Sequence, residues 1–291
     1  MQKFIGTGVA LVTPFNNDLS VDFGALKKLV NYNIDNGTNY LVINGTTGES
    51  GTITEEEKQE IIAVIVAENK GRLPLVLGVG GNNTANVVKE LQTRDLSNID
   101  GILSVAPYYS KPTQEGFYQH FKAIAEATDK PIILYNVPGR TAKNMEPATT
   151  LRLAKDFKNV VAVKEAGNNQ QQYYELIKNK PADFLIISGD DDLALGTTLA
   201  GGSGVISVIG QALPKEFSTM INFGLAGNNV EGYKIHYKLM DLINGIFEEN
   251  NPAGIKSVLH KLNICSDEVR LPLVKASSES QKKLAQFIDN L

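Results

Sequence analysis

Several residue types that support common chemistries are scarce in this chain of 291 residues. It has no tryptophan, three histidines and one cysteine, Cys265. A single cysteine excludes a disulfide within the chain, which fits a reducing compartment. His120, His236 and His260 form no H-E-x-x-H or related spacing. A metal hydrolase and a Ser-His-Asp triad therefore lack support, and we expect no metal site.

The charge pattern and the lack of long apolar runs exclude further classes. Lys and Arg total 28 and Asp and Glu total 32, a formal net charge of −4, and no basic stripe suggests nucleic-acid binding. The first residues, MQKFIG, lack a signal-peptide pattern, so we expect a cytoplasmic protein. The longest uncharged stretch, residues 193–214, is long enough for a membrane span. Several glycines interrupt it, so a helix, a turn and a buried strand explain it better.

A short β-branched run followed by an amphipathic segment recurs along the chain. The runs cover residues 8–13, 40–44, 73–78, 101–106, 131–136, 160–164, 184–188 and 204–209. Asp22 is placed to cap a helix over 23–36, and Thr54 with Glu57 has the capping-box spacing before 58–69. Eight strand–helix units predict an α/β fold, the (β/α)₈ or TIM barrel. A doubly wound open sheet is the competing fold, but the even units and the missing phosphate fingerprint favour the barrel.

After Pro214 the pattern becomes helical to the end of the chain. Helices are expected over 217–226, 230–247, 253–262 and 279–291. No Pro- or Ser-rich linker separates this part from the rest. We therefore expect residues 1–213 to form the barrel and residues 214–291 a C-terminal helical extension packed on it.

Lys164 ends the apolar run Val160–Val163, which is typical of a strand buried on both faces. Desolvation there would disfavour the ammonium form and make the amine a nucleophile. Taken alone, the run is better explained by a lysine that reaches water or pairs with Glu165. The barrel prediction favours the nucleophilic lysine over these alternatives, because active sites of such barrels lie at the C-terminal ends of the strands.

Polar side chains collect at the other predicted strand ends. The segment GTTGES, residues 45–50, offers amides and hydroxyls that could hold a carboxylate, although a plain turn is an alternative. Tyr108, Tyr109 and Tyr135 supply hydroxyls. Arg140 offers a planar fork for a carboxylate, with a surface ion pair as the alternative. A lysine with hydroxyls and an arginine indicates a Schiff base with a carbonyl substrate.

A contiguous acidic run, Asp190–Asp192, resembles a metal cluster at first sight. The acids lack the spacing of a calcium loop and no histidine spacing accompanies them. We expect them to cap the following helix.

Seven motifs spread over most of the chain together resemble one family. They are GTTGES at 45–50, PYYSKP at 107–112, YNVPGRT at 135–141, VKEA at 163–166, SGDD at 188–191, GVISV at 204–208 and RLPL at 270–273. The chain resembles the pyruvate-dependent class I aldolases, and within them the dihydrodipicolinate synthase family. The arginine of YNVPGRT favours that family over the N-acetylneuraminate lyases and keto-deoxy-sugar aldolases, which share the lysine and the tyrosine.

The resemblance implies catalytic roles for four residues. Lys164 would form a Schiff base with pyruvate, and no separate cofactor is expected. Thr46, Tyr109 and Tyr135 would form a proton relay. Tyr109 would come from a partner subunit, since the family is typically a homotetramer built as a dimer of dimers.

The resemblance also implies the substrate-binding residues. Thr46 and Thr47 would hold the pyruvate carboxylate, and Arg140 the carboxylate of aspartate semialdehyde. Gly189 and Ile206 would place backbone carbonyls near the lysine. The product would be 4-hydroxy-tetrahydrodipicolinate, which leads to diaminopimelate and lysine.

An effector site of the family is only partly matched. Ser50, Asn82 and Tyr108 agree with it, but Lys58 stands where lysine-inhibited members have a histidine and Asn86 where they have a glutamate. A cation at Lys58 and a neutral Asn86 would disfavour a cationic lysine. We therefore expect weak or absent feedback by lysine.

Two other functions stay open at this point. One is another Schiff-base aldolase acting on a sugar acid of the N-acetylneuraminate or 2-keto-3-deoxygluconate type. The other is a non-catalytic small-molecule sensor on the same barrel. The relay hydroxyls argue against the sensor, because binding alone would not require them.

Overall fold

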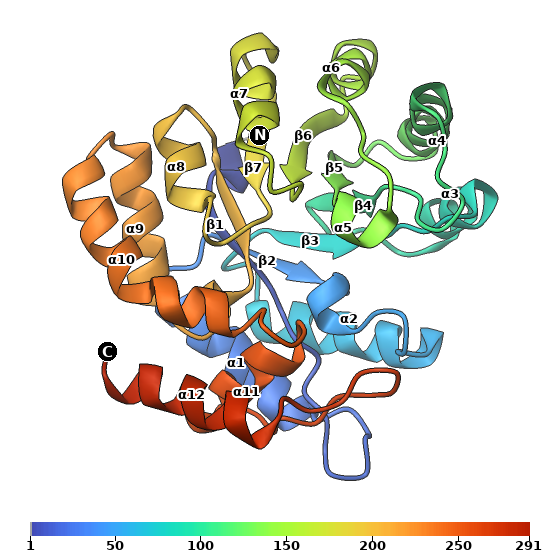
Figure 1. Ribbon diagram of the computed structural model, residues 1–291. Helices are drawn as coiled ribbons and strands as arrows, with labels where there is room; N and C mark the ends of the chain where they lie inside the picture. Colours follow the sequence, from blue (N-terminus) through green and yellow to red (C-terminus); the bar gives the residue numbers. More distant parts are fainter. Residues whose placement is uncertain (1) are drawn as a thin grey trace.

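Eight parallel strands close into a barrel in the computed structural model, which describes residues 2–291 (Figure 1). Each strand pairs with the next, and β8 pairs with β1, so no sheet edge is left open. The prediction of a (β/α)₈ barrel is confirmed. The strands are β1 Gly6–Ala10, β2 Tyr40–Ile43, β3 Leu75–Gly78, β4 Gly101–Val105, β5 Ile132–Asn136, β6 Val160–Glu165, β7 Leu185–Ser188 and β8 Gly204–Ser207.

Helices surround the barrel and continue beyond it (Figure 1). They are α1 Phe23–Asp35, α2 Glu55–Asn69, α3 Thr84–Thr93, α4 Gln114–Glu126, α5 Pro138–Thr141, α6 Pro147–Asp156, α7 Gln170–Asn179, α8 Ala194–Leu199, α9 Pro214–Leu225, α10 Asn229–Gly245, α11 Ala253–Lys261 and α12 Ser278–Asp289. Three 3₁₀ turns are η1 Gln2–Phe4, η2 Thr46–Gly48 and η3 Ile209–Gln211. Both predicted caps are confirmed, by the Asp22 side chain on α1 and by the reciprocal capping box of Thr54 and Glu57 on α2.

The core has two layers because successive strand residues point to opposite sides. One cluster fills the barrel interior and includes Tyr40, Val42 and Ile206, and the larger cluster lies between the strands and the helices. Gly8 makes room for the Tyr40 ring, since a Cβ on Gly8 would come within 2.1 Å of it. Inward-facing residues near the C-terminal strand ends therefore lie above a packed floor.

The four C-terminal helices pack on the barrel and on one another. Helix α9 packs against β1 and β8, α10 against α9, and α11 against α12. Lys28 Nζ of α1 donates to the carbonyl of Asn263, which follows α11, at 2.5 Å. None of the helices within residues 2–291 combines the length and apolarity needed to cross a bilayer.

Candidate active site

Lys164 lies inside the barrel near the C-terminal end of β6, with 6% of its surface exposed. It pairs in register with Tyr135 of β5, and its Nζ lies 4.3 Å from the centroid of the Tyr135 ring. Gly189 leaves room for the lysine, since a Cβ there would come within 3.0 Å of Lys164 Cε. No ion pair joins Lys164 to Glu165, so among the described residues the alternative of a strand-end ion pair is not found.

Glu165 points away from Lys164, to the outer side of β6. Its carboxyl accepts hydrogen bonds from Asn136 Nδ2, at 2.9 and 3.0 Å, and from Gln172 Nε2 at 2.9 Å. Asn136 also donates to Asn144 Oδ1 at 2.8 Å. Burial raises the pKa of Glu165 to about 7, against the effect of these hydrogen bonds. This network joins β5, β6, α7 and the segment after α5.

Two carboxyl groups close to Lys164 follow β7. Asp191 is buried and accepts hydrogen bonds from the backbone nitrogens of Val208, at 3.1 Å, and Ile209, at 2.8 Å. Burial raises the pKa of Asp191 to about 6, and these bonds and the Lys164 charge act in the opposite direction. Burial also raises the pKa of Asp190. Both acids therefore contribute to the field around the lysine.

The prediction that Asp190–Asp192 cap the following helix is wrong. Leu193 is the N-cap of α8, and no side chain caps that helix. Asp191 binds amides after β8 instead, and Asp190 accepts a hydrogen bond from the Asn168 amide at 3.2 Å. These amides come from segments distant in the chain, which local sequence patterns do not reveal.

The GTTGES segment follows β2 and contains the turn η2. Thr47 is buried, and its hydroxyl accepts a hydrogen bond from Asn251 Nδ2 at 3.0 Å. Thr13 Oγ1 donates to the Gly48 carbonyl at 2.7 Å. Thr46 remains partly exposed. The turn thus carries two hydroxyls, one partly exposed and one that accepts a hydrogen bond from a neighbour.

A cavity of about 610 Å³ opens at the C-terminal rim, and six of the thirteen predicted site residues line it. Its lining includes Thr46, Tyr135, Arg140, Ser50, Lys58 and Tyr108. Arg140 is exposed on α5, and no described residue forms an ion pair with it. Its guanidinium is thus available to an anion in the cavity.

The remaining predicted residues, Lys164 and Thr47 among them, do not line this cavity. Ile206 is fully buried inside the barrel, and Gly189 lies beside Lys164. Tyr109 is 89% exposed, has a φ of 69°, and does not line the cavity. Within residues 2–291, no hydrogen bond joins it to Thr46 or Tyr135.

Three of the five predicted effector residues line this cavity. Ser50, Lys58 and Tyr108 line it, and Asn82 Nδ2 donates to the Tyr108 carbonyl at 3.4 Å. Lys58 Nζ pairs with Glu55 at 2.7 Å. Asn86 lies on α3 and lines a different hollow.

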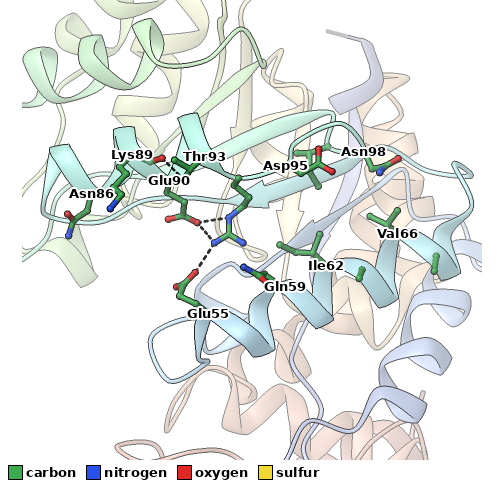
Figure 2. A pocket seen from close by; sticks show the side chains of 14 residues that line it. Glu55, Gln59, Ile62, Val66, Asn86, Lys89, Glu90, Thr93, Asp95 and Asn98 are labelled. Atoms are coloured by element: carbon green, nitrogen blue, oxygen red, sulfur yellow. Dashed lines mark hydrogen bonds and ion pairs between the residues drawn. The ribbon is translucent and has the colours of Figure 1, made fainter.

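That second hollow is a groove of about 960 Å³ between α2 and α3, outside the barrel. Figure 2 shows Glu55 and Glu90 approaching each other across it, and Arg94 joins them at 2.8 and 2.9 Å. Apolar residues such as Ile62 and Val66 line the part along α2. The groove contains none of the residues expected to act on substrate.

Sequence reasoning missed Asn44 and the contacts made by the C-terminal helices. Asn44 is buried, lines the cavity, and its Oδ1 has no hydrogen-bond partner within residues 2–291. The alternation of side chains along β2 could have predicted that Asn44 faces the barrel interior, because Asn44 lies two residues after the inward-facing Val42. Glu49 and Lys256 form a buried ion pair at 2.5 Å, which no local pattern indicates.

Metal-binding side chains are not grouped in the described part of the chain. No set of three or more His, Cys, Asp or Glu residues there could hold a metal ion. The chemistry available to the site is that of an enclosed amine, hydroxyls and a free guanidinium.

Comparison with known proteins agrees with this geometry over nearly the whole chain. A 4-hydroxy-tetrahydrodipicolinate synthase of Flavobacterium psychrophilum is 58% identical, covering 100% of this chain and 99% of the relative. The structure of a chloride-inhibited dihydrodipicolinate synthase from Acinetobacter baumannii complexed with pyruvate matches with a TM-score of 0.95 at 37% identity, covering 98% of each chain. A dihydrodipicolinate synthase from Cyanidioschyzon merolae with lysine bound gives 0.94 at 36% identity, covering 99% of this chain and 98% of that one.

The family itself is shown by a match along the chain. The model of the dihydrodipicolinate synthetase family matches residues 3–291. Its match and the relatives cover both the barrel and the C-terminal helices. The chain belongs to the dihydrodipicolinate synthetase family.

Proposed function

We propose that this protein condenses pyruvate with L-aspartate 4-semialdehyde to give 4-hydroxy-tetrahydrodipicolinate, a lyase reaction of lysine and diaminopimelate biosynthesis. The observation that carries the proposal is the enclosed amine of Lys164 beside the Tyr135 ring. A lysine so placed favours carbonyl chemistry through a Schiff base, which needs no separate cofactor.

The reaction begins at the lysine nitrogen. The neutral amine of Lys164 attacks the ketone carbon of pyruvate, and the ketone oxygen leaves as water, so that an iminium forms. Loss of a proton from the pyruvate methyl group gives an enamine. The enamine carbon attacks the aldehyde carbon of the semialdehyde, and the aldehyde oxygen takes up a proton. Attack by the substrate amino group on the iminium carbon then closes the ring and releases Lys164.

Proton transfer in these steps is assigned to Thr46, Tyr135 and Tyr109. Thr46 and Tyr135 line the same cavity. Tyr109 is 89% exposed, which suits a residue that completes the site of a neighbouring subunit. We therefore assign the protein a dimeric unit that shares this residue, within a homotetramer.

The substrates are assigned to two anion-binding groups. The amides and hydroxyls of Thr46 and Thr47 hold the pyruvate carboxylate. The unpaired guanidinium of Arg140 holds the carboxylate of the semialdehyde. The carbonyls of Gly189 and Ile206 contact groups near the Schiff base.

The remaining assignments concern the rest of the chain and its setting. Residues 1–213, of which residue 1 lies outside the described part, are assigned to the barrel unit and residues 214–291 to the extension; the packing of α10 on α8 and α9 supports an extension attached to the barrel. The protein is cytoplasmic, as its biosynthetic role implies. Lysine acts weakly or not at all at Ser50, Lys58, Asn82, Asn86 and Tyr108.

Trapping of the Schiff base tests the proposal. The protein is incubated with pyruvate, reduced with borohydride and digested, and the modified peptide is identified by mass spectrometry. We expect one adduct, on Lys164, and turnover when the semialdehyde is added. Modification at another lysine, or at none, overturns the mechanism. An adduct without turnover of the semialdehyde, but with turnover of a sugar acid, overturns the substrate assignment.

A further inference from the structure

The C-terminal helices reach into the turn that is assigned to the pyruvate carboxylate. Glu49, the C-cap of η2, has a left-handed backbone, with a φ of 55°. Its side chain is fully buried, and so is that of its partner, Lys256 of α11. The Lys256 Nζ lies 2.5 Å from Glu49 Oε1. A left-handed conformation is uncommon for glutamate, so an external contact is needed to hold it there.

Both oxygens of the Glu49 carboxylate are bound by the C-terminal segment. The backbone nitrogen of Arg270 donates to Glu49 Oε2 at 2.9 Å. Lys256 Nζ also donates to the Glu268 carbonyl at 2.7 Å and lies 4.1 Å from the centroid of the Phe15 ring. The ion pair is thus enclosed by partners on several sides, and its geometry is fixed.

A second contact reaches the threonine hydroxyl itself. Asn251, just before α11, donates from Nδ2 to Thr47 Oγ1 at 3.0 Å, and both residues are buried. A hydroxyl has one proton to donate and lone pairs to accept with. Because Asn251 occupies an acceptor position on Thr47, the Thr47 proton is left to donate elsewhere. A carboxylate next to the turn is the natural acceptor for it.

We infer that Asn251 and Lys256 are positioning residues for the pyruvate carboxylate, so that the C-terminal extension, and not the barrel alone, sets the pyruvate affinity of the site. The inference rests on the proposed role of Thr46 and Thr47. Asn251 orients the Thr47 hydroxyl as a donor. Lys256 fixes Glu49, and with it the backbone of η2 that carries both threonines.

The barrel side of the turn supplies the opposing support. Thr13 Oγ1 donates to the Gly48 carbonyl, and a Cβ on Gly48 would come within 3.2 Å of the Leu11 carbonyl. On the other side, Arg270 joins the C-terminal segment to α2 through an ion pair with Glu57 at 2.6 Å. The turn therefore lies between two fixed supports, and loss of the C-terminal one should leave it free to shift.

Pyruvate affinity in matched variants tests the inference. Lys256→Met removes the buried charge, and Lys261→Met is the control, because Lys261 lies on the same helix but pairs with Asp289 at an exposed position. For Lys256→Met we expect the pyruvate concentration that half-saturates adduct trapping to rise at least about tenfold, since small misplacements of positioning groups have large effects. The KM for the semialdehyde should stay within about twofold of the wild-type value. The pyruvate half-saturation and the semialdehyde KM of the Lys261→Met control should also stay within about twofold of the wild-type values.

Asn251→Ala provides a second, milder variant. It removes one hydrogen bond, so pyruvate half-saturation should rise about two- to tenfold while the folded protein is retained. If Lys256→Met does not fold, the pyruvate half-saturation of Asn251→Ala tests the inference in its place. Lower thermal stability with unchanged pyruvate half-saturation, or an equal rise in KM for both substrates, overturns the inference. Failure of the unmodified protein to form an adduct on Lys164 would instead overturn the proposed function.

Discussion

The amine nitrogen of Lys164 lies 4.3 Å from the centroid of the Tyr135 ring, and the two residues are register partners on adjacent strands. Both are nearly buried, at 6% exposure each. The sheet thus fixes the distance between the amine nitrogen and the aromatic ring. A loop could not hold the two groups as accurately.

Replacement of Tyr135 by Phe should therefore slow turnover without loss of the fold. A positioned acid or base contributes about 10² to 10⁴ in rate, and the ring itself is kept in this variant. We expect kcat to fall by about that factor and adduct formation with pyruvate to slow as well. Tyr174→Phe, an exposed tyrosine on α7, is the control. Unchanged kinetics in Tyr135→Phe would remove this hydroxyl from proton transfer.

Arg140→Ala should weaken use of the semialdehyde while sparing the pyruvate adduct. Arg140 has no protein carboxylate partner in the described chain, and a hydrogen bond to a charged group contributes roughly 1.5–3 kcal/mol. We expect kcat/KM for the semialdehyde to fall about 10- to 100-fold. Steady-state kinetics and borohydride trapping measure the two effects separately. Arg152→Ala, which breaks an exposed pair with Glu115, is the control. Loss of the adduct in Arg140→Ala would show that the arginine has another role.

Subunit mixing tests whether Tyr109 acts across an interface. Tyr109→Phe and Lys164→Ala should each be nearly inactive alone. In a mixed dimer, one site combines an intact Lys164 with the partner's intact Tyr109. Coexpression of the two chains should then restore about a quarter of the wild-type activity, because half of the randomly paired dimers are mixed and each has one complete site. Absence of recovery in demonstrably mixed dimers would place Tyr109 within its own subunit, and an active Tyr109→Phe variant would remove Tyr109 from the relay.

The sequence predicted the barrel and most of its rim because both depend on local patterns. Alternation and run length locate strands, and the C-terminal strand ends of a barrel share one rim. Lys164, Tyr135 and Arg140 could therefore be assigned to that rim from the sequence alone. The pairing of Glu49 with Lys256 joins residues far apart in the chain, and no periodicity encodes it. Asp191 is a second example. Its acidic run predicts a helix cap, but its carboxylate accepts hydrogen bonds from backbone amides after β8.

Lysine should inhibit this protein weakly. The Lys58 ammonium lines the cavity beside Ser50 and Tyr108, and a neutral amide stands at Asn86. A cationic ligand therefore lacks a carboxylate partner at Asn86 and meets an ammonium that already occupies the Glu55 carboxylate, so half-inhibition should require lysine well above about 1 mM. Initial rates over a lysine series measure this. The double variant Lys58→His and Asn86→Glu should become more sensitive. Half-inhibition below that concentration in the unmodified protein would contradict the prediction.

The buried carboxyl of Glu165 should make stability depend on pH in a defined range. Its folded-state pKa of about 7 lies above the ordinary value of 4.5, so the folded state binds the proton more tightly than the unfolded state. The stabilisation is complete below pH 4.5 and is lost as the pH rises through 7. For a shift of this size the loss is on the order of 3 kcal/mol.

Glu165→Gln should abolish this part of the pH dependence. Urea unfolding midpoints are measured between pH 4.5 and 8 at one protein concentration, and the wild-type curve should fall more steeply with pH than the variant curve. Any constant loss from altered hydrogen bonds to Asn136 and Gln172 shifts the variant curve without changing its slope. Asp191 titrates in both proteins and cancels in the comparison. Glu175→Gln, at an exposed position of α7, should retain the wild-type slope. Parallel curves for the wild type and Glu165→Gln would show that Glu165 does not bind its proton more tightly in the folded state.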